Sequence, residues 1–160
     1  MKIWLGDVGK LVLCIAICEL AGVIGSVFTI SVIPTWYTGL VKPALNPPSW
    51  VFGPAWIVLY ALMGIAAFLI WKRGWQRKEV RTALGIFGAQ LIVNAAWSLI
   101  FFGARNPFYA LIDILLLWVL ILLTIVAFYR VSKPAAYLLL PYICWVSFAM
   151  YLNYMIYVLN

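Results

Sequence analysis

The sequence contains no histidine and few acidic residues: four Asp and Glu stand against eleven Lys and Arg in 160 residues. Without histidine, the common zinc sites and a histidine-ligated haem iron are excluded. Charged residues make up 9% of the chain, whereas a soluble domain carries roughly 25%. The sequence therefore predicts neither a metal centre nor a soluble globular domain.

Several functional motifs are missing as well. The chain has no glycine-rich phosphate loop, no nucleophile–base pair, and no internal repeat of the kind that inverted-repeat transporters carry. Conventional hydrolytic or redox catalysis is not expected, and we expect no required cofactor. A light-dependent reaction of a bound ligand stays open.

Long apolar runs are abundant, because 68% of the residues are hydrophobic. A helix needs about 20 apolar residues to cross the roughly 30 Å core of a bilayer. The sequence predicts an all-α, polytopic membrane protein: a single domain of five transmembrane helices spanning about residues 9–33, 51–71, 80–103, 107–129 and 134–158. Prolines 107 and 134 are expected in first helical turns, and Pro141 is expected to kink the fifth span.

The net charge of +7 is unevenly distributed along these spans. If the chain crosses the membrane five times, nine of the eleven basic residues lie on one side of the membrane: Lys2, Lys10, Lys72, Arg73, Arg77, Lys78, Arg81, Arg130 and Lys133. Only Lys42 and Arg105 fall on the other side. The asymmetry predicts a cytoplasmic N-terminus and no nucleic-acid partner.

The three cysteines, Cys14, Cys18 and Cys144, all lie within apolar spans, and we interpret them as buried and inert. Two acids lie there too. Glu19 is either the coupling carboxylate of a proton-driven exporter or a protonated group bonded to a neighbouring helix. Asp113, two turns from Arg105, is interpreted as a structural anchor of the turn before the fourth span.

The connection at residues 34–50 is long and contains four of the eight prolines, together with Trp36, Tyr37 and Trp50. We expect an ordered lid over the non-cytoplasmic mouth of the bundle. The alternative is an interfacial loop whose tryptophans sit at headgroup level.

Three spans carry stripes of aromatic and polar residues at helical spacing. They comprise Phe52, Trp56, Tyr60 and Met63; Gln90, Asn94, Trp97, Ser98 and Phe101; and Tyr142, Trp145, Ala149 and Leu152. Such stripes are typical of a site for a flat apolar ligand, or of helix packing with interhelical hydrogen bonds. On the third span, Gly85 and Ala89 form a small-xxx-small pair that predicts a homodimer.

Five blocks of residues occur in order along the chain: Trp36-Tyr37 with Lys42-Pro43 and Asn46–Trp56; Leu59-Tyr60 with Met63-Gly64; Gln90-Leu91 with Asn94, Trp97 and Phe101-Phe102-Gly103; Ala110-Leu111 with Asp113; and Pro141-Tyr142 with Trp145, Phe148-Ala149 and Leu152-Asn153-Tyr154. Together they resemble the signature of the translocator protein family, the TspO or peripheral benzodiazepine receptor group.

That resemblance implies a homodimeric five-helix membrane receptor for porphyrins such as protoporphyrin IX and haem, and for flat synthetic drugs. It implies a role in tetrapyrrole sensing, transport or photo-oxidative degradation. Trp56 matches the family tryptophan implicated in porphyrin breakdown, with Trp145 as a second candidate. The ligand-binding set carried over is Trp36, Tyr37, Pro47, Trp56, Asn94, Trp97, Trp145, Phe148 and Ala149.

Lys42 or Arg105 is expected to meet the porphyrin propionates, and the Asn94 amide to bond the ligand with little role in folding. The sequence departs from the cholesterol motif of animal members, because no Lys or Arg follows Leu152-Asn153-Tyr154. The short C-terminus is similar to bacterial members and implies a bacterial cell membrane. A small proton-coupled exporter of hydrophobic compounds using Glu19 remains the alternative function.

Overall fold

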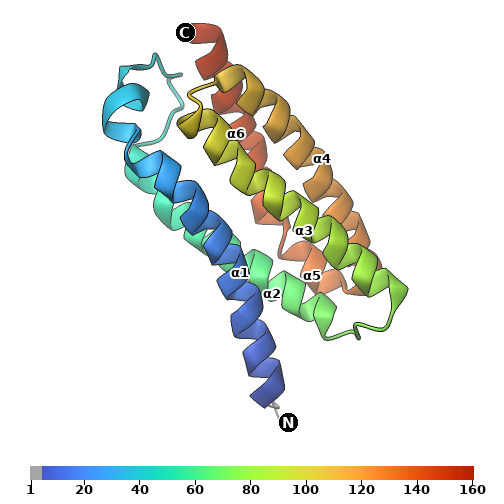
Figure 1. Cartoon of the computed structure of the whole chain (residues 1–160). Helices are drawn as coiled ribbons and strands as arrows, with labels where there is room; N and C mark the ends of the chain where they lie inside the picture. The colour runs from blue at the N-terminus through green and yellow to red at the C-terminus, as the bar shows by residue number, and fades with distance from the viewer. Residues whose placement is uncertain (1–4) are drawn as a thin grey trace.

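A computed structural model describes residues 5–160, and the Lys2 of the charge count lies outside that range. The chain folds into a bundle of long helices with two π-helical turns and one 3-10 turn (Figure 1). The helices are α1 (Leu5–Ile30), α2 (Phe52–Trp71), α3 (Lys78–Ser98), α4 (Pro107–Val131), α5 (Lys133–Tyr137) and α6 (Leu140–Leu159). The short turns are η1 (Ile33–Tyr37), η2 (Ser49–Val51) and η3 (Leu99–Gly103).

Five helical segments within residues 5–160 are long and apolar enough to cross a membrane. They are Gly6–Ile30, Ser49–Trp71, Lys78–Gly103, Pro107–Val131 and Lys133–Leu159, with mean hydropathies from 1.6 to 2.9. The prediction of an all-α protein with five membrane-spanning helices is confirmed. The first segment begins and ends about three residues earlier than the sequence patterns indicated.

Prolines mark where helices begin. Pro107 and Pro134 occupy the first turns of α4 and α5, as predicted, where a missing N–H leaves no bond unmade. Pro141 corrects an expectation: it does not kink a continuous helix. The chain breaks between Tyr137 and Leu140, so that Pro141 lies in the first turn of α6. The fifth span is therefore two helices, and no interior carbonyl loses its donor.

Close helix contacts depend on glycine at α1 and α2. A Cβ at Gly64 would lie 2.5 Å from the Ile15 Cα, and a Cβ at Gly22 would lie 2.5 Å from Tyr60 Cε2. Because neither glycine has a side chain, the two backbones approach closely. In Figure 1, α1 and α2 lie against one another on one side of the bundle, while α3, α4 and α6 form the rest.

The buried residues correct the interpretation of the cysteines in one case. Cys14 and Cys18 on α1 are buried, as expected, but Cys144 on α6 is exposed on the surface of the bundle. A helix inside a bilayer turns part of its apolar surface to lipid, so an apolar span does not by itself imply burial in protein.

The basic residues of the α2–α3 and α4–α5 connections lie at the same end of the bundle as the N-terminus (Figure 1). At that end Lys72 pairs with Asp7, Nζ to Oδ2, at 3.4 Å. The long α1–α2 connection and the C-terminus lie at the other end. We propose that the basic end is cytoplasmic.

A labelling experiment tests this orientation. In a variant whose three cysteines are replaced, a single cysteine at Thr38 should react with an impermeant maleimide in intact cells. One at Gln76 should react only after permeabilisation. Both side chains are exposed, so accessibility in the fold does not limit either reaction. Labelling of Gln76→Cys alone in intact cells would reverse the topology.

The proposed dimer surface faces outward. Gly85 and Ala89 are exposed on α3, and a Cβ at Gly85 meets no atom within 4 Å. Gly85→Leu therefore fits the single chain, and it should lower the dimer fraction crosslinked in membranes by blocking close backbone approach. Ala16→Leu, on an exposed position of α1, is the matched control. An unchanged dimer fraction in Gly85→Leu would move the dimer interface to another surface.

A candidate ligand cavity

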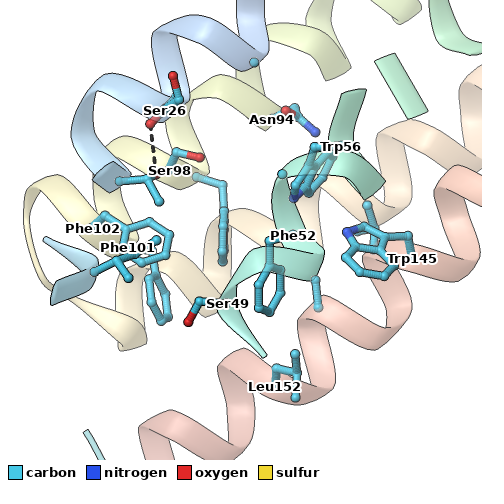
Figure 2. Close-up of a pocket in the computed structure, with 18 of the residues that line it drawn as sticks. Ser26, Ser49, Phe52, Trp56, Asn94, Ser98, Phe101, Phe102, Trp145 and Leu152 are labelled. Carbon is cyan, nitrogen blue, oxygen red and sulfur yellow. Dashed lines mark hydrogen bonds between the residues drawn. The ribbon is translucent and has the colours of Figure 1, made fainter. Parts of the chain in front are cut away.

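A cavity of about 490 Å³ lies between α1, α2, α3 with η3, and α6 (Figure 2). The α1–α2 connection also contributes to its wall through Ile33, Tyr37 and Ser49. Its volume falls within the range of sites for small organic ligands, about 300–1,000 Å³. The bundle therefore holds a ligand-sized space near its non-basic end.

Nine aromatic residues contribute to the wall. Trp97 stacks on Phe101 with ring centroids 5.1 Å apart, and Phe52 meets Trp145 edge to face at 6.0 Å. Trp56 stacks on Tyr60 at 5.4 Å. Figure 2 shows Phe52, Trp56 and Trp145 on one side of the cavity and Phe101 and Phe102 on the other. Such walls suit a flat π-system, which gains stacking energy as well as apolar burial.

A chain of hydrogen bonds joins α2, α3 and α6 beside this wall. Tyr60 Oη donates to Asn94 Oδ1, Asn94 Nδ2 donates to Tyr142 Oη at 2.8 Å, and Tyr142 Oη donates to Gln90 Oε1 at 2.8 Å. Asn94, Gln90 and Tyr142 are buried. The Asn94 amide is thus engaged on both its oxygen and its nitrogen. These are the interhelical hydrogen bonds of the alternative interpretation, so we assign Asn94 a structural role as well as a place in the cavity wall.

A second buried amide ties α3 to α4 and α6. Trp97 Nε1 donates to Asn153 Oδ1 at 3.0 Å, and Asn153 Nδ2 donates to the Pro107 carbonyl at 2.8 Å. Trp97 consequently has its indole nitrogen fixed and only its ring face available to a ligand. Asn153, the middle residue of the motif considered for cholesterol, is engaged inside the protein.

Trp145 differs from Trp97. Its Nε1 is buried and has no hydrogen-bond partner among the described residues. In Figure 2 the indole nitrogen lies on the side of the ring nearest Trp56. A buried, unpaired N–H costs free energy that a ligand acceptor would recover.

The connection between α1 and α2 is held in place by specific bonds. Tyr37 packs on Phe101 and Phe102 and donates from its phenol to Asn46 Oδ1 at 3.1 Å. Burial raises the pKa of Tyr37, and the hydrogen bond to Asn46 opposes that shift in part, so the phenol remains a neutral donor. At the far end of the bundle's last helix, the Asn160 amide pairs with both the N–H and the carbonyl of Val41, at 2.9 and 3.0 Å.

Two basic residues were considered for ligand carboxylates, and the structure separates them. Lys42 Nζ lies 4.7 Å from the centroid of the Tyr37 ring, and Tyr37 lines the cavity. Arg105 is exposed in the turn after η3, with φ of 52°, and does not line the cavity. Lys42 is therefore the better placed of the two.

The two intramembrane acids have different surroundings. Glu19 lines the cavity from α1. Asp113 on α4 does not, and its Oδ2 is buried with no hydrogen-bond partner in the part of the chain that the structure describes. Among residues 5–160 no ion pair joins Asp113 to Arg105. The contact between Asp113 and Arg105 that their spacing suggested as an anchor of the turn is absent from the described part of the chain.

Of the nine residues expected to bind ligand, the structure brings six to the cavity wall: Tyr37, Trp56, Asn94, Trp97, Trp145 and Ala149. The other three lie elsewhere. Trp36 packs edge to face on Phe101 at 5.8 Å, Pro47 lies in the connection, and Phe148 lines a shallow groove between α2 and α6. Both tryptophans proposed for porphyrin breakdown, Trp56 and Trp145, lie in the wall.

The sequence interpretation missed the α1 side of the cavity. Glu19, Gly22, Ser26 and Thr29 all line it, at spacings of three and four residues that place them on one helical face. The small and polar members of this stripe were a usable signal. The stripe was overlooked because it contains no large aromatic residue.

These features define a polytopic helical membrane protein with an internal, aromatic-walled ligand cavity. The chain belongs to the TspO/MBR family, whose profile matches residues 14–159. It is 49% identical over 150 residues to the tryptophan-rich protein TspO of Chlorobaculum tepidum, covering 94% of this chain and 95% of that one. It is 48% identical over 121 residues to the human translocator protein, covering 74% and 71%. The tryptophan-rich sensory protein of Cereibacter sphaeroides is 38% identical over 119 residues, covering 74% and 73%.

Proposed function

We propose that this protein is a membrane receptor that binds porphyrins, such as protoporphyrin IX and haem, and related flat apolar ligands. The observation that carries the proposal is the aromatic wall of the 490 Å³ cavity, with Trp56, Trp97 and Trp145 contributed by three different helices. A porphyrin is a wide π-system that needs such walls. The proposed membrane is the bacterial cell membrane.

The expected affinity follows from the surface that a porphyrin buries. Removing some 400 Å² of apolar ligand surface from water stabilises the complex by about 10 kcal/mol at 25 cal/mol/Å². Association costs several kcal/mol, and a ligand that arrives from lipid gains less. A dissociation constant in the micromolar range is the expected result.

The porphyrin propionates require a partner at the polar edge of the site. Lys42 supports this role because its ammonium lies over Tyr37 and is held by the Thr38 and Leu40 carbonyls at 3.4 and 3.2 Å. Tyr37, whose ring the ammonium overlies, lines the cavity where the α1–α2 connection contributes to the wall. The propionates would exchange those neutral carbonyls for charge-assisted bonds.

Light-dependent porphyrin loss is a second candidate activity, supported by the position of Trp56. Its ring lines the cavity and stacks on Tyr60, so the indole is presented directly to a bound π-system. Light would excite the porphyrin, with molecular oxygen as the terminal oxidant. Trp145 is the second tryptophan in reach of the same space.

Trp56→Phe tests both parts of the proposal. A ring remains, so protoporphyrin IX affinity should change by no more than about three-fold, since one stacking contact contributes about 1 kcal/mol. Loss of porphyrin absorbance under illumination should slow several-fold, because phenylalanine lacks the oxidisable indole. Trp75→Phe, at an exposed position in the α2–α3 connection, is the control. Unchanged decay in Trp56→Phe would exclude the tryptophan chemistry while leaving the binding proposal intact.

The proton-coupled exporter remains the alternative, and the one observation in its favour is that Glu19 lines the cavity. No other acid among residues 5–160 contributes to that wall. We propose sensing or disposal of tetrapyrroles ahead of export, because a single carboxyl supplies a binding group but no relay across the bundle.

A further inference from the structure

A porphyrin with two ionised propionates is a dianion, which would require a positively charged group in its site. The charged residue in the cavity wall is acidic instead. Glu19 is the one residue of the described lining that carries a formal charge, and neither Lys nor Arg contributes to the wall. Glu19 lies near the middle of the Gly6–Ile30 span. An acid at that depth is costly unless a partner offsets it.

Within residues 5–160, Glu19 has no ion-pair partner and takes part in no side-chain hydrogen bond. Neighbouring polar groups of the wall are engaged elsewhere: the Ser26 hydroxyl donates to the Val23 carbonyl at 2.7 Å, and the Thr29 hydroxyl to the Gly25 carbonyl at 3.0 Å. Tyr60 donates to Asn94. The protein itself therefore leaves the Glu19 carboxyl available to a ligand.

The aromatic side chains near Glu19 also favour a positively charged ligand. Gly22, one turn after Glu19, packs directly on the Tyr60 ring, and Tyr60 stacks on Trp56 with the ring planes 28° apart. The faces of these rings carry negative charge density, which attracts cations. Tyr60 is buried between Gly22 and Trp56, so the Glu19 carboxyl and the free face of Trp56 remain for a ligand.

The two charged groups near the ligand space are well separated along the molecule. Lys42 belongs to the α1–α2 connection, whereas Glu19 is eleven residues before Ile30, the end of the first span. At 1.5 Å per residue that is about 16 Å along α1. An anionic group can therefore be held at the mouth without approaching Glu19, and a cationic group in the interior without approaching Lys42.

We infer that the cavity also accepts flat aromatic cations, with Glu19 as their counter-ion and the free face of Trp56 as their stacking surface. This ligand class is distinct from porphyrins. The inference rests on the cavity and not on porphyrin binding, so either can fail alone.

The test compares two tricyclic probes of the same shape. At neutral pH 9-aminoacridine is a cation and acridine is neutral. Affinities are measured by probe fluorescence anisotropy with purified protein in nanodiscs of phosphatidylcholine, a zwitterionic lipid that does not concentrate cations. The unmodified protein should bind 9-aminoacridine about ten-fold more tightly than acridine, a preference equal to about 1.4 kcal/mol. Equal affinities would overturn the inference without any variant being needed.

Three variants assign that preference to Glu19. Glu19→Gln should reduce it to about two-fold or less while acridine affinity stays unchanged, and Glu19→Asp should retain it, because the charge remains. Glu79→Gln removes the same charge from an exposed site at the start of α3 and should leave the preference intact. A preference that survives Glu19→Gln, or that falls equally in Glu79→Gln, would contradict the assignment.

Discussion

Replacing Ala149 with phenylalanine is expected to abolish most porphyrin binding without unfolding the protein. Ala149 lines the cavity from α6, between the positions of Trp145 and Leu152 on the same face. A benzyl group there would occupy space that the porphyrin ring needs, and the protein would lose about 2 kcal/mol or more of ligand burial and stacking. The dissociation constant should rise by about 30-fold or more.

Stability should change little in this variant. The cavity of about 490 Å³ accommodates the added ring, so no neighbouring side chain is forced from its rotamer. Ala16→Phe, at an exposed position of α1, adds the same group outside the cavity and should leave affinity unchanged. Titration of both variants with protoporphyrin IX, next to thermal unfolding in detergent, provides the comparison. Wild-type affinity in Ala149→Phe would place the ligand elsewhere.

The second large effect is expected at Asn94, and it concerns folding. Asn94→Leu removes the acceptor of the Tyr60 hydroxyl and the donor to Tyr142. The Tyr60 hydroxyl is then buried without a partner, while Tyr142 still donates to Gln90. The free energy of unfolding should fall by about 1–3 kcal/mol.

A double-variant comparison isolates the cause. Adding Tyr60→Phe to Asn94→Leu removes the unpaired hydroxyl and should restore part of the lost stability, so the two changes are not additive. Gln76→Leu replaces an exposed amide by leucine and should be neutral. Thermal unfolding of Tyr60→Phe, Asn94→Leu, the double variant and Gln76→Leu in one detergent gives the comparison. Additive losses would show that no coupled network joins Asn94 to Tyr60.

Sequence patterns predicted the membrane-spanning helices well because hydrophobic length is a one-dimensional signal. The same reasoning placed Pro107 and Pro134 in first turns, as the structure has them. The expectation of a kink at Pro141 was wrong. The helix breaks at Leu138 and Leu139, and because both residues are apolar, the break leaves no trace in the hydropathy pattern. The lipid-facing position of Cys144 was missed for a related reason: an apolar span does not indicate which face meets protein.

The cavity was only partly predictable. Helical spacing correctly grouped Trp56 with Phe52 and Tyr60, and Trp145 with Ala149. It could not distinguish residues that face empty space from residues that bond one another. Gln90 and Asn94 belong to the stripe of Trp97, yet their amides join tyrosines of two other helices. Such pairings depend on how three helices are placed together, which no single helical period contains.

The central claim is that the aromatic cavity is a porphyrin site, and one titration tests it most directly. Protoporphyrin IX is added to the purified protein, and tryptophan emission is followed with Trp56, Trp97 and Trp145 in the cavity wall as reporters. We expect saturable quenching at one porphyrin per chain with a dissociation constant in the micromolar range. Quenching that rises linearly without saturation, as partitioning into detergent would give, would contradict the central claim.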